Sequence, residues 1–386
     1  MKHLLLKTLM PCVCCIIGLT SLSVAYAGFF GPDLNGDRSV LSIEKYRFNP
    51  AISWGDEFNY TGAPDSAKWG LDEGNGYYGW GNKEQQYYTR RIDNAVVKGN
   101  TLQIIARAEA FHGFQFTSAK LNTLDKRMFQ YGRFEIRAKL PVSGGMWPAI
   151  FMFGEDHQWY NLQSWPDCGE IDLIELNGNA PHLIHNHIHS GYFNYARGRP
   201  AGHQTSVSGN AGKFNIYRID WTPDYIRWFI NDVQSFEFKN DGGGHSHWPF
   251  DDWFNLVLAL SVGGNFVGTI DQSALPQTYE IDYVRYYKLL GGYGKPPKIR
   301  PAAPVLAVKH AMKRKGESFT FAIKSKPSKS TIKWYANGGF IASGDAVTLP
   351  PATPLGIYTG AVTAVDKTTG ISSKAVAISI KVVAEP

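Results

Sequence analysis

Three carboxylates lie close together in residues 165–175, which read WPDCGEIDLIE. In a strand, side chains alternate between two faces, so Glu170 and Asp172 share one face and Glu175 points to the other. A single β-bulge between Asp172 and Glu175 would bring all three acids to the same face. Like charges so close push one another's pKa values apart, so one carboxyl stays protonated while another ionises. A retaining glycosidase needs this, with its nucleophile and general acid about 5 to 5.5 Å apart.

The alternative is a solvated polar face on an ordinary strand. Ile171, Leu173 and Ile174 make the other side of the segment apolar, which leaves the acids on the wet side. Unpaired acids crowded on one face destabilise a sheet, so we favour a catalytic function. The residues alone leave open which glutamate would attack a substrate.

The next alternating run, HNHIH, places His185, His187 and His189 on one face of a strand. Three imidazoles on one face could hold a metal ion. The other interpretation, which we favour, is a row of polar side chains that line a wet cleft. Cys168 is the single cysteine after residue 27, so an internal disulfide is excluded there. We interpret it as a small buried residue rather than a reactive thiol.

The elements that must position these residues are strands. Residues 52–288 are rich in Gly, Trp, Tyr and Phe, and contain short alternating runs separated by turn residues. The run DYIRWFINDVQSFEF predicts a hairpin that turns at Asn231 and Asp232. No long amphipathic helix interrupts the pattern. We therefore predict an all-β fold, an antiparallel jelly-roll β-sandwich.

The chain divides into five predicted regions. Residues 1–27 have the positive start, the apolar run and the Ala-Tyr-Ala cleavage site of a signal peptide. An N-terminal extension follows at 28–51, then a catalytic domain at 52–288 and a Gly- and Pro-rich linker at 289–304. Residues 305–386 are predicted to form a small immunoglobulin-like β-sandwich module. We expect an exported protein, secreted or periplasmic, with no membrane anchor.

The positive charge belongs to the C-terminal part. Of the net +6, residues 289–386 contribute 14 Lys and Arg against 4 Asp and Glu, so the rest is net negative. The KRK run at 313–315 lacks the interleaved aromatics of nucleic-acid readers, so we expect no nucleic-acid partner. We interpret it as a solvated basic face on a spacer or glycan-binding module. Trp334, Tyr335 and Tyr358 are candidates for a small sugar platform there, at least one of them belonging to the core.

WPDCGEIDLIE resembles the signature of glycoside hydrolase family 16 in its bulged form, with acids at the first, third and sixth places. Other segments resemble the family in the same order along residues 52–288: SWGDEFN, GWGNKEQQYYTRRIDNAVV, YGRFEIRAKLP, GGMWPAIFMFG and LSVGGNFVG…YEIDYVRYYK. They are most similar to the laminarinase-like branch, endo-acting enzymes on β-1,3-linked glucans. The resemblance implies that Glu170 is the nucleophile, Glu175 the general acid/base and Asp172 the assisting acid. It also implies that His189 hydrogen-bonds the carboxylates.

The resemblance further implies a set of substrate-binding residues, since glycan clefts combine aromatic platforms with polar groups. These are Trp147, Phe151 (where the family usually has Trp), Trp165, Asn82, Glu84 and, on a loop, Trp248. Two other positions depart from the family: Lys120 replaces an arginine and Ala259 an asparagine. Residues 190–204 are peculiar to this chain.

The expected activity is hydrolysis of β-1,3-glucans by a monomer that needs no cofactor for catalysis and whose partner is the polysaccharide. The alternatives are hydrolysis or transglycosylation of another β-glycan, such as mixed-linkage glucan, agarose or carrageenan. A further alternative is a glucan-binding lectin on the same scaffold. Such lectins characteristically lose one or both glutamates, whereas all three acids are present here, so we favour the enzyme.

Two places are candidates for calcium. DLNGDRSVLSIE has calcium-loop spacing at Asp33, Asn35, Asp37 and Glu44, although an arginine occupies the sharp-turn glycine position. The alternative is an exposed Asp- and Asn-rich loop. Separately, the family resemblance implies a structural calcium ion on the convex side of the sandwich, for which Asp282 is the candidate ligand.

Overall fold

The computed structural model describes residues 45–384, except 77, 158–164, 208–210, 297, 299–300, 337–338, 369–371 and 374–375. The predicted signal peptide and the calcium-loop residues Asp33, Asn35, Asp37 and Glu44 lie outside the described residues. Among the residues that are described, no helix is both long and apolar enough to span a bilayer.

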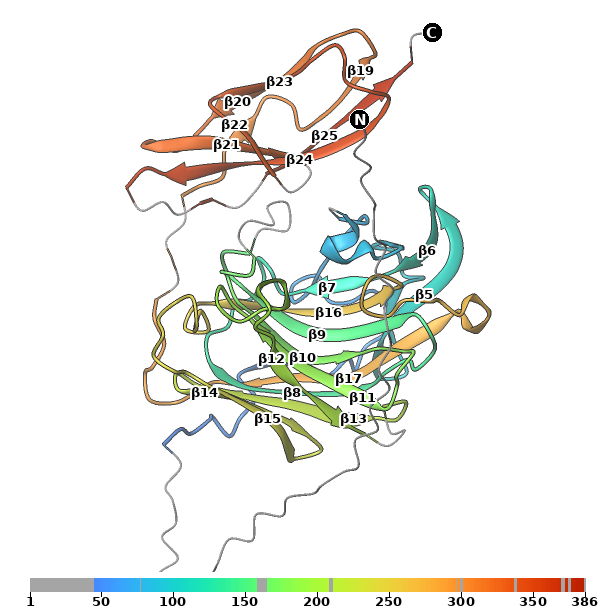
Figure 1. Cartoon of the computed structure of the whole chain (residues 1–386), viewed down its shortest axis with the longest axis vertical. Helices are drawn as coiled ribbons and strands as arrows, with labels where there is room; N and C mark the ends of the chain where they lie inside the picture. The colour runs from blue at the N-terminus through green and yellow to red at the C-terminus, as the bar shows by residue number, and fades with distance from the viewer. Residues whose placement is uncertain are drawn as a thin grey trace, which may run out of the picture. The chain divides into compact units, whose positions relative to one another are not determined.

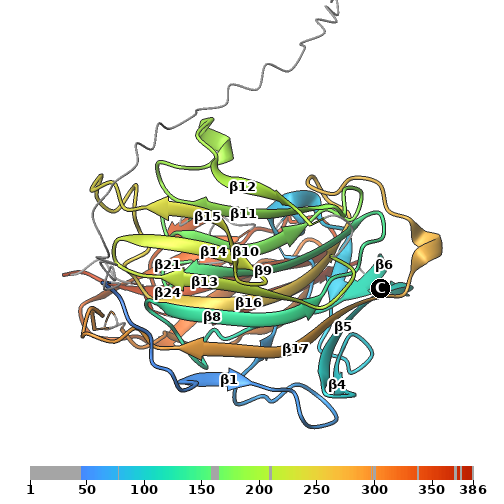
Figure 2. The same ribbon diagram turned by 90° about the horizontal axis from the view of Figure 1, so that it is seen from below.

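Two antiparallel sheets form the first domain, as predicted (Figure 1). The larger runs in the order β15-β14-β13-β8-β17-β5-β6-β3, with β1 on β17 and β4 on β5. Its strands are β1 (Trp54–Asp56), β3 (Gln86–Tyr88), β4 (Ala95–Lys98), β5 (Thr101–Phe111), β6 (Phe114–Ser118), β8 (Gly132–Lys139), β13 (Asn215–Trp221), β14 (Tyr225–Ile230), β15 (Val233–Lys239) and β17 (Gln277–Tyr287). Figure 2 views the domain from the side of this sheet. Only β3 and β6 pair in parallel among these strands as described.

The smaller sheet runs in the order β12-β11-β10-β9-β16-β7-β2. Its strands are β2 (Gly70–Leu71), β7 (Lys120–Asn122), β9 (Met146–Gly154), β10 (Glu170–Leu176), β11 (Leu183–His189), β12 (Ala201–Ser206) and β16 (Phe254–Val262). Short helical turns occur at η1 (Gly79–Lys83), η3 (Tyr195–Arg197) and η4 (Gln272–Ala274). Glu170, Asp172, Glu175 and the three histidines of the HNHIH run belong to β10 and β11, which follow the edge strand β12 in this sheet.

The alternating pattern of each strand decides what it buries. In β8, Phe134, Ile136 and Ala138 are fully buried in the core between the sheets, while the residues between them point outward. β16 is buried along its whole length. Its leucines pack in the core, and the alternate residues Ala259 and Ser261 line a cleft on the opposite face. The smaller sheet thus has one face on the core and one on the cleft.

The hairpin at Asn231 and Asp232 is confirmed. These two residues connect β14 to β15 and have φ of 49° and 65°. Positive φ at both central positions is the type I′ geometry, whose twist matches that of the paired strands. Asn and Asp tolerate this left-handed conformation better than other side chains do.

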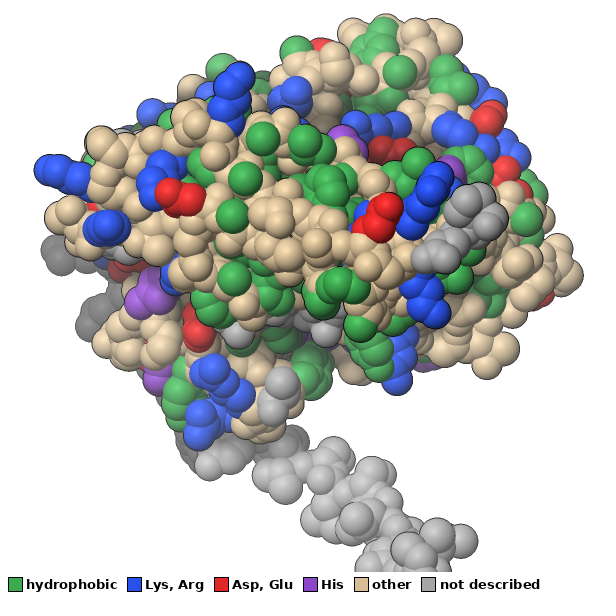
Figure 3. Space-filling view, turned by 90° about the horizontal axis from the view of Figure 1, so that it is seen from above, with side chains coloured by type: hydrophobic (Ala, Val, Ile, Leu, Met, Phe, Trp, Pro, Cys, Tyr) green, Lys and Arg blue, Asp and Glu red, His purple; other side chains and the backbone are tan. Residues whose placement is uncertain are grey.

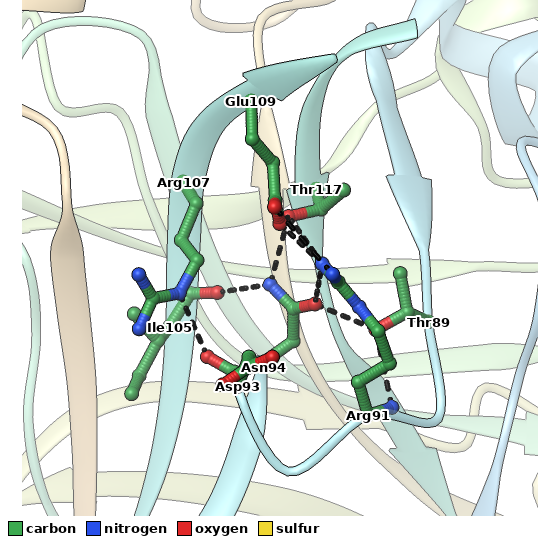
Figure 4. Close-up of polar contacts among 8 residues, drawn as sticks. All are labelled: Thr89, Arg91, Asp93, Asn94, Ile105, Arg107, Glu109 and Thr117. Atoms are coloured by element: carbon green, nitrogen blue, oxygen red, sulfur yellow. Dashed lines mark hydrogen bonds and ion pairs between the residues drawn. The ribbon is translucent and has the colours of Figure 1, made fainter. Parts of the chain in front are cut away.

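A buried asparagine fastens the segment between β3 and β4 (Figure 4). The Asn94 side chain accepts hydrogen bonds from Thr89 Oγ1 at 2.6 Å and Arg91 Nη2 at 3.0 Å. It donates to the carbonyl of Ile105 at 2.9 Å and to Thr117 Oγ1 at 3.0 Å. Because Ile105 lies on β5 and Thr117 on β6, one amide ties this segment to two neighbouring strands.

We expect Asn94→Ala to lower the free energy of unfolding by about 3 kcal/mol, because it leaves several buried polar groups without a partner. Urea unfolding followed by tryptophan fluorescence measures this, since ten of the 11 tryptophans lie in residues 52–288. The matched control is Asn240→Ala, at an exposed asparagine that also makes local hydrogen bonds. Equal, small losses in the two variants would contradict the structural role of Asn94.

The C-terminal residues form a separate small β-sandwich with its own core, consistent with the predicted immunoglobulin-like module. Its strands are β18 (Val305–Leu306), β19 (His310–Arg314), β20 (Phe319–Ser325), β21 (Ser330–Ala336), β22 (Gly339–Ser343), β23 (Ala346–Leu349), β24 (Gly356–Asp366) and β25 (Val376–Val383). The expectation that at least one of the three candidate aromatic residues belongs to the core is confirmed, because Trp334 is fully buried and donates to the Gly344 carbonyl, and Tyr335 is also buried, so neither of these two is a platform. Tyr358 is only partly buried against the same core.

The basic run of the module is only partly solvated. Arg314 and Lys315 are exposed, but Lys313 is buried, and its Nζ donates to the carbonyls of Glu317 and Pro350. On the face in Figure 3, Lys and Arg side chains are scattered among hydrophobic and uncharged groups and form no continuous patch on that view. One of the three charges in the KRK run therefore acts within the fold rather than toward a partner.

Candidate active site

A bulge in β10 gathers the three acids, as predicted. Glu170, Asp172 and Glu175 pair with consecutive cleft-facing residues of β11, and the register shifts between Asp172 and Glu175. Against β9 the register also shifts just after Asp172. The extra residue returns Glu175 to the face that carries Glu170 and Asp172. The remaining side chains of this stretch point into the core and are fully or almost fully buried: Ile171, Leu173 and Ile174.

Two tryptophan indoles hold the two glutamates. Trp165 Nε1 donates to Glu170 Oε2 at 2.7 Å, and Trp147 Nε1 donates to Glu175 Oε1 at 3.1 Å. An indole N–H is a donor only, so it orients a carboxylate without competing for its protons. The aromatic residues predicted to bind substrate therefore also fix the carboxyl groups.

The histidine row of β11 contacts the acid row directly. His189 Nε2 lies 3.3 Å from Asp172 Oδ2, the contact that the family resemblance implied. His187 Nδ1 lies 3.1 Å from Glu175 Oε2, and its Nε2 lies 2.9 Å from the Tyr195 hydroxyl. Each of these two histidines thus serves one acid, and a loop tyrosine reaches the histidine that serves Glu175.

Burial and mutual repulsion separate the acids in their affinity for protons. Burial, followed by the charge of Asp172, raises the pKa of Glu170 to about 8. Burial and the charge of Glu175 raise the pKa of Asp172 well above its ordinary value. For Glu175, burial alone would raise the pKa, but the hydrogen bond and charge of His187 outweigh it and lower the pKa. The carboxyls therefore differ in protonation although they share one face.

A cleft of about 710 Å³ opens over the acids and the strands beside them. It is lined by Trp80, Asn82, Glu84, Tyr88, Lys120, Trp147, Ala149, Phe151, Phe153, His157, Glu170, Asp172, Glu175, Ala259 and Ser261. The predicted substrate residues Asn82, Glu84, Trp147 and Phe151 are thus assembled around the catalytic candidates. Its mixture of aromatic and polar groups suits a glycan.

The middle of the cleft is open because small residues form its floor there. Ala259 of β16 pairs with Ala149 of β9 on one side and Lys120 of β7 on the other, and Ala149 pairs with Glu175. The two alanines leave open space between Lys120 and Glu175. Glu84 borders the same space, and burial raises its pKa.

Lys120 does not present an unmatched charge to the cleft. Its Nζ lies 3.0 Å from Asp72 Oδ2 and 3.4 Å from the centroid of the Trp80 ring. The carboxylate of Asp72 and the face of the Trp80 ring both stabilise the ammonium group of Lys120 at this position. The residue therefore pins Trp80 at the edge of the cleft.

Comparison with known proteins agrees with this geometry. The family model "Glycosyl hydrolases family 16" matches residues 82–285. The chain belongs to this family. A β-glucanase of Rhodothermus marinus is 44% identical over 245 residues, covering 61% of this chain and 85% of the relative. The X-ray structure of the laminarinase from Rhodothermus marinus superposes with a TM-score of 0.60 and 42% identity, covering 64% of this chain and all of that one.

A more distant relative is "Glucan endo-1,3-beta-glucosidase A1" of Niallia circulans, 34% identical over 288 residues, which cover 67% of this chain and 41% of the relative. The residues that the family model matches, 82–285, belong to the first domain, where the cleft lies. The chain is therefore a glycoside hydrolase of family 16, and its all-β fold agrees with that of its relatives.

In this family 16 hydrolase, Trp248 is not the predicted loop platform. It is 4% exposed and belongs to the core, where its ring stacks against Phe238. A ring buried on both faces offers no surface to a sugar, so that prediction is wrong. Cys168, by contrast, is buried as predicted, and burial raises the pKa of its thiol well above the ordinary value.

Asp282 on β17 does not provide a ready calcium ligand. Its Oδ2 accepts a 2.6 Å hydrogen bond from Arg137 Nη1, so a cation already neutralises the carboxylate. Within the described ranges, the side chains whose ligand atoms lie close enough for a metal, within 4.8 Å, are Asp172, Glu175 and His187. Those three are engaged in the acid network, and we assign them to proton chemistry. Calcium binding stays a prediction.

The sequence interpretation missed the functions of His187 and Tyr195. The alternation in HNHIH placed His187 on the right face, but nothing in the pattern paired it with Glu175 rather than Asp172. In the backbone register His187 is opposite Asp172 and Glu175 is opposite His185, so the contact between His187 and Glu175 is a diagonal one between the two strands. Tyr195 lies in residues 190–204, where no periodic pattern indicates a position.

Proposed function

We propose that this family 16 enzyme is an endo-acting hydrolase of β-1,3-linked glucans that retains anomeric configuration. The observation that carries the proposal is the single bulged strand with Glu170, Asp172 and Glu175 on its cleft face. The similarity to β-glucanases and laminarinases supports the substrate class. We also propose that the protein acts after export, because a glucan polymer is met outside the cytoplasm.

In the proposed reaction, Glu170 attacks the anomeric carbon while Glu175 protonates the departing glycosidic oxygen. A covalent glycosyl-enzyme forms on Glu170, and Glu175 then removes a proton from the water that releases it. Asp172 lies between the two glutamates on the same face, and its hydrogen bond with Glu170 keeps the nucleophile in position.

The proton that Glu175 needs is held by its pair with His187. A proton on His187 Nδ1 can move across the 3.1 Å contact to the Glu175 carboxylate. The transfer leaves a neutral imidazole and a carboxylic acid. The His187 Nε2 atom also shares a 2.9 Å hydrogen bond with the Tyr195 hydroxyl, which fixes the orientation of the ring. The lowered pKa of Glu175 in the resting site is thus compatible with its function as an acid.

The charge of the cleft favours a neutral glycan over a sulfated one. The one cation that lines it, among the residues described, is Lys120, which is paired with Asp72. The acids of the cleft would repel sulfate groups, whereas a glucan ring needs only stacking and hydrogen bonds.

The proposal is tested by reducing-end release from laminarin, mixed-linkage β-glucan, agarose and κ-carrageenan, with the anomer of the first product followed by NMR. We expect cleavage of laminarin and a product that first appears as the β-anomer. Cleavage of a galactan alone, or an α-anomer, would contradict the proposal. Glucan binding without any cleavage would favour the lectin alternative.

We expect kcat/KM on laminarin to rise with pH up to an apparent pKa of about 8, the pKa of Glu170. Catalysis needs the ionised nucleophile, and below this pKa the ionised fraction falls about tenfold per pH unit. Because kcat/KM reports on the free enzyme, initial rates at low substrate concentration across the pH range measure it. An acidic limb near 4.5, the ordinary value for glutamate, would show that burial does not control this carboxyl.

A further inference from the structure

Residues 190–204 form a loop with internal hydrogen bonds beside the histidine row. Asn194, fully buried, donates from Nδ2 to the Ser190 carbonyl at 3.0 Å and accepts from the Arg197 N–H at 3.0 Å. The turn η3 ends at Gly198, whose φ of 66° reverses the chain. The loop then returns as β12, which pairs with β11 at the edge of the smaller sheet. Its conformation is therefore set by its own hydrogen bonds.

The register of β12 extends the cleft face beyond the histidines. Gly202 pairs with His187, and Gln204 pairs with His185. A Cβ at Gly202 would lie 1.9 Å from Cδ2 of His187, so a side chain there would displace the imidazole. The glycine leaves the space in which the His187 ring lies against Glu175.

Tyr195 is held in place and yet open to solvent. Its hydroxyl lies 2.9 Å from His187 Nε2, and its ring centroid lies 5.5 Å from that of His187 and 6.0 Å from that of His189. The residue is nevertheless 57% exposed. An aromatic ring fixed at one end and exposed on its surface is suited to stack on the apolar face of a sugar.

An open hollow of about 680 Å³ adjoins this ring, lined by His187, Tyr195, Pro200, Gly202, His203 and Gln204. It lies over β11 and β12, whereas the cleft with Asn82, Glu84 and Trp147 lies over β10, β9, β16 and β7. Glu170 and Glu175 both line the cleft, whereas His187, which contacts Glu175, lines the hollow. The part of the substrate that bonds to Glu170 must occupy the cleft, and the hollow adjoins the partner of the group that protonates the departing oxygen, so the leaving part extends toward the hollow.

We propose that this hollow is the subsite for the leaving portion of the glucan, with Tyr195 as its stacking platform. The inference rests on the proposed function, and it makes residues 190–204 the segment that selects a sugar leaving group. This placement is consistent with the proposed reaction. His187 lines the hollow and contacts Glu175, the group that protonates the departing oxygen.

The test compares laminarihexaose with β-laminaribiosyl fluoride, whose leaving group is a single ion and needs no sugar subsite. In Tyr195→Ala, we expect the ratio of kcat/KM for the hexaose to that for the fluoride to fall about tenfold, the value of one lost stacking contact. Tyr195→Phe should keep the wild-type ratio, because it keeps the ring. The matched control is Tyr192→Ala, on the same loop, whose ring stacks on His247 and does not line the hollow.

An unchanged ratio in Tyr195→Ala would overturn the subsite. So would an equal fall in Tyr195→Phe, because the hydroxyl bond to His187 would then carry the effect. Wild-type protein inactive on both substrates would instead refute the proposed function, and this inference with it.

Discussion

Glu170→Gln is expected to lower kcat on laminarin by at least about 10⁴-fold, because the amide cannot form the glycosyl-enzyme. The substitution keeps shape and an oxygen that accepts from the Trp165 indole, so the cleft should stay assembled. Reducing-end release measures the loss. Asp167→Asn is the matched control: it removes an exposed acid three residues earlier and should keep wild-type activity. Activity retained in Glu170→Gln would refute the assignment of the nucleophile.

The same variant also reports on the cost of burying the carboxyl. The pKa of Glu170 is raised in the folded state, so the folded protein binds its proton more tightly than the unfolded chain does. That contribution to stability is complete below the ordinary value of about 4.5 and is lost as the pH rises through about 8. Glu170→Gln should therefore gain stability relative to wild type as the pH increases over this range. Thermal melts at both ends of the range measure it.

The chemistry of the site was predictable where local spacing determines it. Three acids at positions 170, 172 and 175 cannot share a face of a regular strand, so the spacing itself required a bulge, and the structure has one there. Asn231 and Asp232 likewise predicted their hairpin, because few residues adopt positive φ at two successive positions. In both cases the constraint acts between residues that are close together in the sequence.

Partners across the fold were not predictable in the same way. His187 meets Glu175 because two strands pair in a particular register, and periodicity specifies a face but no register. Trp248 failed as a platform for a related reason. A tryptophan on a loop has the same local pattern whether it covers a core or a sugar, and only the packing of β15 against it decides. The position of Tyr195 beside His187 could not be predicted either, because it depends on how its loop folds.

Glu175→Ala should show a loss that depends on the leaving group. On laminarin we expect kcat to fall about 10³-fold, within the usual contribution of a general acid. With 2,4-dinitrophenyl β-laminaribioside, the first step should stay fast, because a dinitrophenolate leaves without protonation. A burst of dinitrophenol followed by slow turnover is then expected, since the base that activates water is also missing. Stopped-flow absorbance measures both phases.

Azide distinguishes the two glutamates by stereochemistry. In Glu175→Ala, azide can replace water and attack the glycosyl-enzyme on Glu170, which should speed turnover and give the β-glycosyl azide. In Glu170→Ala, azide would instead take the place of the nucleophile and give the α-azide. An α-azide from Glu175→Ala would mean that the two glutamates have exchanged functions. The structure argues against the exchange, because Glu175, not Glu170, is the carboxyl paired with His187, from which it can receive a proton.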